Sequence, residues 1–135
     1  MLPDISSVWG MFSDRPLLLI DVPIGLVEKG EDGRPCDTAA RRVLGFPRAS
    51  SVFSPPARSS LTAPNREVAS EINYRLTGKR ISAQTWRIVP KIREVDDFLR
   101  ATPQALPRVR EVNPEVLFWG LNGGLAMRKD RKSVV

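Results

Sequence analysis

The sequence predicts a small mixed α/β fold. Two short segments, residues 17–22 and 108–112, have the length and the apolar patterning of β-strands. The stretches around and between them place apolar residues at helical spacing, and turns rich in proline or glycine separate them. Because helical crossovers join parallel strands, we expect these strands to be parallel neighbours in a central layer with helices on its faces.

Length and composition are those of one globular domain. The chain has 135 residues, of which 41% are hydrophobic and 27% charged, so we expect a single domain over residues 1–135. No apolar run has the length of a membrane span and no secretory signal is visible, which predicts a cytoplasmic protein without a membrane partner. The lone cysteine, Cys36, suits a reducing compartment.

The absence of histidine narrows the chemistry. Without histidine there can be no Ser-His or Cys-His nucleophile pair and no imidazole metal ligand. Catalysis would have to use carboxylates, hydroxyls or cations. The net charge of +6 favours an anionic partner such as nucleic acid, although a solvated basic surface accounts for the charge equally well.

The first two expected elements are a helix over residues 5–12 and a strand over residues 17–22. In the helix, apolar residues recur along one face, and Asp4 is placed to cap the first turn. The strand is apolar at successive positions, so we expect it to be buried on both faces. Asp21 lies near its C-terminal end.

A short helix over residues 37–44 precedes a long loop rich in proline and serine, residues 45–64. Within this loop, residues 51–53 could form a short strand. Arg48 and Arg58 in the loop could contact phosphates, but a solvated polar loop is the more economical interpretation.

Two further helices follow, over residues 64–76 and from Ser82 onward. We expect Pro90 to kink the second of them. Its predicted buried stripe consists of Ile88, Ile92, Val95 and Leu99.

The strand over residues 108–112 alternates polar and apolar residues, which predicts one face open to water. A helix start comes next: Asn113 is a capping residue, Pro114 suits the first helical position, and Glu115 favours the positive end of the helix dipole. Residues 125–135 form a basic tail.

Two carboxylates end the predicted strands. Asp21 and Glu111 both fall at C-terminal strand ends, which meet at one edge of a parallel layer. Such a pair could hold Mg²⁺ or Mn²⁺ for phosphodiester cleavage, since hard cations prefer oxygen ligands. Two alternatives remain: Asp21 could cap the following turn, and Glu111 could pair with an arginine.

Five motifs in order give the chain a family resemblance. They are Leu19–Leu26, then Arg34–Asp37 with Ala40-Arg41 and Leu44-Gly45, then Ser50–Phe53, Pro90–Asp96 and Glu111–Glu115. With these segments the chain resembles the uncharacterised family called domain of unknown function 429. The resemblance covers roughly residues 17–121.

That family is regarded as a set of predicted nucleases with a ribonuclease H-like fold. The resemblance therefore implies a partial ribonuclease H-like layer and a metal-dependent hydrolase acting on nucleic-acid phosphodiesters. It implies that Asp21 and Glu111 are catalytic and that Asp21, Glu111 and Glu115 bind Mg²⁺ or Mn²⁺. The motif residues implied to line a substrate groove are Arg34, Asp37, Arg41, Lys91, Arg93, Glu94 and Asp96.

The chain departs from the family pattern in three places. The N-terminal antiparallel meander and the C-terminal acidic helix are missing, and Asn113 stands where the family tends to have histidine. An incomplete domain would leave the sheet exposed, so we expect a second copy or a partner chain to cover it. The alternatives to an active nuclease are an inactive derivative, a nucleic-acid-binding module and a partner-completed interaction module.

Overall fold

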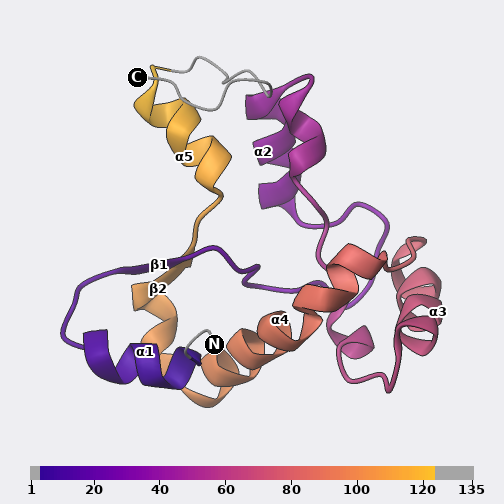
Figure 1. Cartoon of the computed structure of the whole chain (residues 1–135), viewed down its shortest axis with the longest axis horizontal. Helices are drawn as coiled ribbons and strands as arrows, with labels where there is room; N and C mark the ends of the chain where they lie inside the picture. Colours follow the sequence, from indigo (N-terminus) through magenta and orange to yellow (C-terminus); the bar gives the residue numbers. More distant parts are fainter. Residues whose placement is uncertain (1–3, 124–135) are drawn as a thin grey trace. The chain divides into compact units, whose positions relative to one another are not determined.

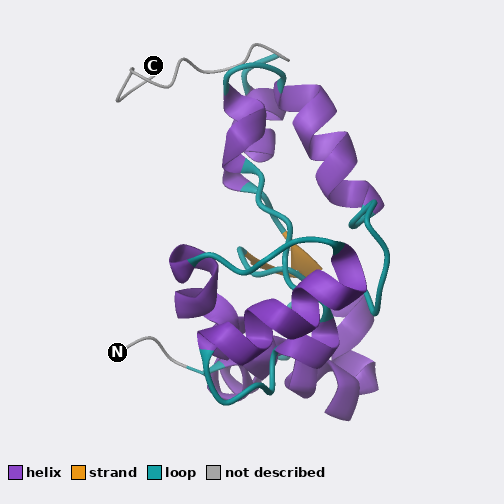
Figure 2. Ribbon diagram, turned by 90° about the vertical axis from the view of Figure 1, so that its right-hand side faces the viewer, coloured by secondary structure: helices purple, strands orange, loops and turns teal. Residues whose placement is uncertain are grey.

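The computed structural model describes residues 4–123, which adopt a mixed α/β fold dominated by helices (Figures 1 and 2). These residues form two compact units. The larger unit comprises residues 4–31 and 55–111, and the smaller unit comprises residues 32–54 and 112–123. The expectation of a single domain over residues 1–135 stays a prediction.

The larger unit contains the strands and most of the helices. Its elements are α1 (Ile5–Phe12), β1 (Leu18–Ile20), the 3-10 helix η2 (Arg58–Ser60), α3 (Arg66–Thr77), α4 (Ala83–Ala101), the 3-10 helix η3 (Pro103–Arg108) and β2 (Val109–Glu111). The smaller unit contains α2 (Pro35–Leu44), the 3-10 helix η1 (Arg48–Ser51) and α5 (Pro114–Leu121). Within residues 4–123, no helix combines the length and apolar character needed to cross a membrane.

The predicted parallel pairing is confirmed. β1 and β2 form a two-stranded parallel sheet in which Leu18 is opposite Val109 and Ile20 is opposite Glu111. The expectation that the first strand is buried on both faces is wrong, because Leu19 is half exposed. Successive side chains of a strand point to opposite faces. One face of β1 packs on a core cluster through Leu18 and Ile20, and Leu19 points to the other face.

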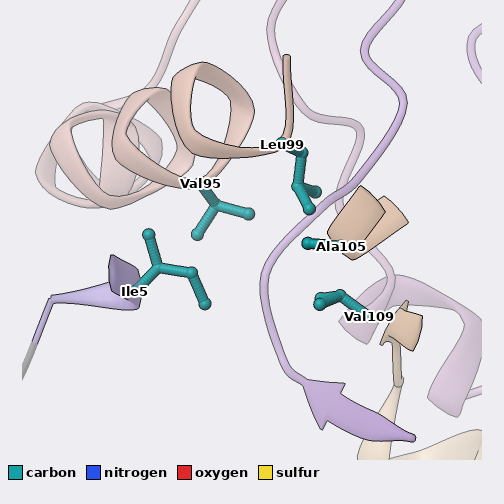
Figure 3. Close-up of a cluster of buried hydrophobic side chains, with 5 residues drawn as sticks. All are labelled: Ile5, Val95, Leu99, Ala105 and Val109. Atoms are coloured by element: carbon teal, nitrogen blue, oxygen red, sulfur yellow. The ribbon is translucent and has the colours of Figure 1, made fainter. Parts of the chain in front are cut away.

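Helix α4 supplies side chains to two apolar clusters of the larger unit. Toward its C-terminus, Val95 and Leu99 pack with Ile5 of α1, Ala105 of η3 and Val109 of β2 (Figure 3). Toward its N-terminus, buried side chains form the second cluster, whose members are Leu26, Leu61, Val89 and Ile92. One helix therefore connects the sheet to the loop around η2.

The buried stripe of α4 differs in one position from the prediction. Ile92, Val95 and Leu99 are buried as expected, but Val89 takes the place of Ile88, which is 40% exposed. Both positions are compatible with a 3.6-residue period relative to Ile92. Val89 packs with Leu61 and Leu26, and this contact, made by a distant loop, selects the face.

The predicted helix caps are confirmed by hydrogen bonds from backbone N–H groups. Asp4 accepts from Ser7 at 2.7 Å, Ser82 from Thr85 at 3.1 Å, and Asn113 from Glu115 and Val116 at 3.0 and 3.2 Å. The expected strand over residues 51–53 is wrong. Ser51 ends η1, and the Val52 carbonyl accepts hydrogen bonds from the Arg41 side chain, so this backbone bonds to a side chain and forms no ladder.

The burial pattern of α4 predicts that truncating a buried side chain lowers the free energy of unfolding more than truncating an exposed one. Ile92 is 1% exposed, so Ile92→Ala should lower the free energy of unfolding by about 2–5 kcal/mol. The matched control is Ile88→Ala on the exposed side of the same helix, which should cost less than about 1 kcal/mol. Urea unfolding followed by circular dichroism measures both. Equal losses of unfolding free energy for the two variants would contradict the burial of Ile92 and the exposure of Ile88.

Candidate functional site

Asp21 and Glu111 lie at the C-terminal ends of the paired strands. Glu111 is the last residue of β2 and is opposite Ile20, the last residue of β1. Asp21 directly follows Ile20. Both residues are exposed to solvent. The structure therefore brings together the two carboxylates that the strand positions predict.

The backbone that follows Asp21 is held by two contacts. The Glu111 carboxylate accepts a hydrogen bond from the backbone N–H of Ile24 at 3.0 Å, 87 positions away in sequence. Val22, which directly follows Asp21, packs against both apolar clusters of the larger unit. These contacts fix the turn that carries Asp21, and they give Glu111 a structural role in addition to its charge.

The two carboxylates influence each other electrostatically. The pKa of Asp21 is raised above its ordinary value of 3.8, chiefly because neighbouring protein atoms remove part of the water around this exposed carboxylate, and second because the negative charge of Glu111 is close. A divalent cation would offset both effects by neutralising the pair.

Asp21 and Glu111 form a limited donor set for a metal ion. Among residues 4–123, no group of three or more His, Cys, Asp or Glu side chains is arranged to hold one. Two carboxylates nevertheless suit Mg²⁺, which is commonly bound through one or two carboxylates together with waters and substrate phosphates. The donor set thus fits a cation that binds with its phosphate substrate.

Glu115 belongs to the smaller unit, where it contacts the loop after α2. Its carboxylate accepts a hydrogen bond from the Ser51 hydroxyl at 3.0 Å and pairs with Arg48 at 3.4 Å. The described structure thus shows Glu115 joining α5 to η1. Its part in metal binding stays a prediction.

Three further motif residues of the smaller unit also make internal contacts. Arg34 and Asp37 form a buried two-point ion pair, with distances of 2.7 and 2.9 Å, at the start of α2. Arg41 donates to the carbonyl of Val52 and to the hydroxyl of Ser54, both at 2.9 Å. These arginines therefore stabilise α2 and the loop that follows it.

The motif residues of α4 lie in the larger unit with Asp21 and Glu111. Lys91 pairs with Glu94 at 3.1 Å, and Glu94 also accepts the backbone N–H of Ile5 at 2.8 Å. Arg93 is half exposed and lies 3.7 Å from Asp97. Asp96, in contrast to these residues, is buried, with an exposed fraction of 8%.

Arg58 is the partner of buried Asp96. It donates to both carboxylate oxygens of Asp96, at 2.9 and 3.0 Å, and also pairs with Glu28. The hydrogen bonding to Asp96 is the main reason that the pKa of Arg58 is raised. Arg58 therefore ties η2 to α4, a role that its place in a polar loop did not reveal, because the partner is 38 positions away.

Arg108 is a second residue whose role the sequence did not indicate. Its guanidinium donates to the backbone carbonyls of Ser13 and Arg15 and lies over the ring of Trp9, 4.9 Å from the ring centroid. Arg108 therefore connects the residue before β2 to the segment before β1. This contact helps to align the strands that carry Asp21 and Glu111.

The comparisons with known proteins identify the family. The model of the family described as "Protein of unknown function (DUF429)" matches residues 1–134, so the chain belongs to this family. The match confirms the resemblance carried by the five motifs. Neither the curated proteins nor the solved structures contain a match to the chain.

The raised pKa of Asp21 predicts a pH-dependent effect of Asp21→Asn. A raised pKa means that ionised Asp21 opposes folding at pH values above its folded-state pKa, and that this cost disappears as the pH falls below about 3.8. Asp21→Asn should therefore leave stability unchanged or raise it by up to about 0.5 kcal/mol at pH 7. The gain should shrink toward zero below pH 4.

Urea unfolding at several pH values between 3.5 and 7 measures this difference. Asp14→Asn is the matched control, because its side chain is 79% exposed. A loss of more than about 1 kcal/mol at pH 7 for Asp21→Asn would show that the carboxylate stabilises the turn, contrary to this expectation.

Proposed function

We propose that this member of the family is a nuclease-like protein that acts on nucleic-acid phosphodiesters with Mg²⁺ or Mn²⁺. The observation that carries the proposal is the proximity of Asp21 and Glu111 at the C-terminal ends of a parallel strand pair. Functional groups of open α/β layers gather at this edge. We also propose that the strand pair is part of a ribonuclease H-like layer.

The two carboxylates would hold the cation, and exposed arginines of the larger unit, such as Arg93, would hold the substrate backbone. When bound, such a cation neutralises phosphate charge and lowers the pKa of a bound water. Asp21 would supply its ligand oxygens from a turn fixed by Val22, and Glu111 from the end of β2. The net charge of +6 favours the approach of a polyanion.

A second candidate function is metal-independent nucleic-acid binding. It is favoured by the small donor set of two carboxylates, since among residues 4–123 no group of three or more His, Cys, Asp or Glu side chains is arranged to hold a metal ion. In that case the cationic surface would bind the nucleic acid, and the affinity for nucleic acid would fall as the salt concentration rises, whether or not a divalent ion is present.

We also propose that another protein surface covers the outer face of β1, a second copy of the chain being the simplest source. Leu19 of β1 and Leu17, the residue directly before the strand, are each 50% exposed, and they lie two residues apart in the sequence. Exposed apolar residues on the open face of a two-stranded sheet favour association.

Cleavage assays test the proposed activity. With a fluorescent single-stranded oligonucleotide and 5 mM Mg²⁺ or Mn²⁺ as typical conditions, we expect cleavage that EDTA abolishes. Asp21→Asn should reduce the rate by about a hundredfold or more while folding is retained, because a metal ligand is lost. The matched control, Asp14→Asn, should cleave at the wild-type rate. Salt-sensitive binding without any cleavage would support the second candidate.

Sedimentation tests the proposed association. Analytical ultracentrifugation at micromolar concentrations should show a dimer, and Leu17→Lys with Leu19→Lys should shift it to monomer by placing charges on the strand face. Leu106→Lys, at a residue 49% exposed in η3, serves as the matched control. A folded wild-type monomer would rule out self-association.

A further inference from the structure

A pocket of about 480 Å³ opens along α4 in the larger unit. Its apolar part is made by Leu61, Val89, Pro90 and Trp86, with Ala63 beside them, and its polar part by side chains of α4. This volume falls in the range of sites that bind small organic groups. None of its residues belongs to the Asp21–Glu111 pair.

The polar part of the pocket contains both signs of charge. Arg93, Glu94 and Asp97 line it, and Arg93 and Asp97 are each more than half exposed. The 3.7 Å separation of Arg93 from Asp97 is too long for a direct hydrogen bond. A ligand that donates hydrogen bonds and also carries negative charge would satisfy both kinds of group.

The indole ring of Trp86 indicates which class of ligand fits the pocket. Its side chain is partly buried and packs at the edge of the second apolar cluster. No contact between aromatic rings among residues 4–123 involves Trp86, so its indole packs against no other aromatic ring there. An indole next to an apolar floor suits a planar heterocycle.

We infer that this pocket binds an unpaired nucleobase of a single-stranded nucleic acid, an inference that rests on the proposed function and names its substrate class. The base would lie against Trp86 and the apolar floor, its exocyclic amine would donate to Glu94 or Asp97, and Arg93 would contact the adjacent phosphate. An aliphatic ligand would form no hydrogen bond with the polar side chains of the pocket.

The pocket and the acidic pair share one framework. The floor residues Leu61 and Val89 belong to the apolar cluster against which Val22 packs, and Val22 directly follows Asp21. A nucleotide held at α4 would therefore be held by the same compact unit that carries the two acids. This connection supports a role of the pocket in positioning the strand to be cleaved.

Oligonucleotide binding in EDTA tests the inference without any contribution from metal or cleavage. The probe is a fluorescein-labelled single-stranded 12-mer, as DNA and as RNA, followed by fluorescence anisotropy. Trp86→Leu should weaken binding about tenfold, as expected for the loss of one base–aromatic contact. The matched control, Trp9→Leu, removes a partly buried tryptophan of the same unit outside the pocket and should bind like wild type.

A second pair of variants avoids the risk that Trp86→Leu fails to fold. Arg93→Gln changes a half-exposed side chain of the pocket, and Arg87→Gln changes an exposed arginine of α4 outside it. Arg93→Gln should weaken binding more than Arg87→Gln. A blunt duplex of the same sequence, whose bases are stacked and paired, should bind equally to wild type and Trp86→Leu.

Equal affinities of the Trp86 and Trp9 variants, or of the Arg93 and Arg87 variants, would overturn the inference. So would a loss of duplex binding equal to the loss for single strands. The outcome is independent of the cleavage assay. If Trp86→Leu weakens binding but the wild-type protein does not cleave, the base-binding pocket is supported and the nuclease activity is rejected. If the wild-type protein cleaves but Trp86→Leu binds as tightly as wild type, the nuclease activity is supported and the pocket is rejected.

Discussion

The parallel pairing of β1 with β2 is the constraint on which the larger unit depends. It joins segments from opposite ends of that unit, and such non-local contacts require that chain entropy be overcome by burial elsewhere. Val109, 1% exposed, supplies part of this burial, and Arg108 fastens the chain before β1 to the chain before β2. Without this pairing, Asp21 and Glu111 would have no common edge.

Helix α4 stabilises both the strand pair and the loop around η2, because its two halves pack into different apolar clusters. Val95 and Leu99 cover the sheet, while Val89 and Ile92 cover the loop around η2. The pairing of buried Asp96 with Arg58 adds a charged link to the same loop. A buried carboxylate requires such a partner, since an unpaired charge in an apolar setting is costly. Motif residues of α4 thus stabilise the fold whatever they contribute to binding.

Local signals in the sequence predicted most of the helices. Asp4, Ser82 and Asn113 were identifiable as caps, since a short polar side chain before an apolar periodic stretch satisfies backbone N–H groups locally. The strands were also identifiable, but the burial of Leu19 was overestimated. Apolar patterning indicates that a strand can be covered on both faces, and only the packing elements decide whether it is.

The sequence by itself determined the α-helices and the two paired strands, the caps, the positions of Asp21 and Glu111 at strand ends, and the exclusion of imidazole chemistry, because these depend on residue identity and short-range spacing. The tertiary structure alone decided the partners of charged residues and the buried face of α4. Arg58 finds Asp96 38 positions away, and Val89 is buried by Leu61. Such contacts depend on how distant segments meet in space, which no local pattern encodes.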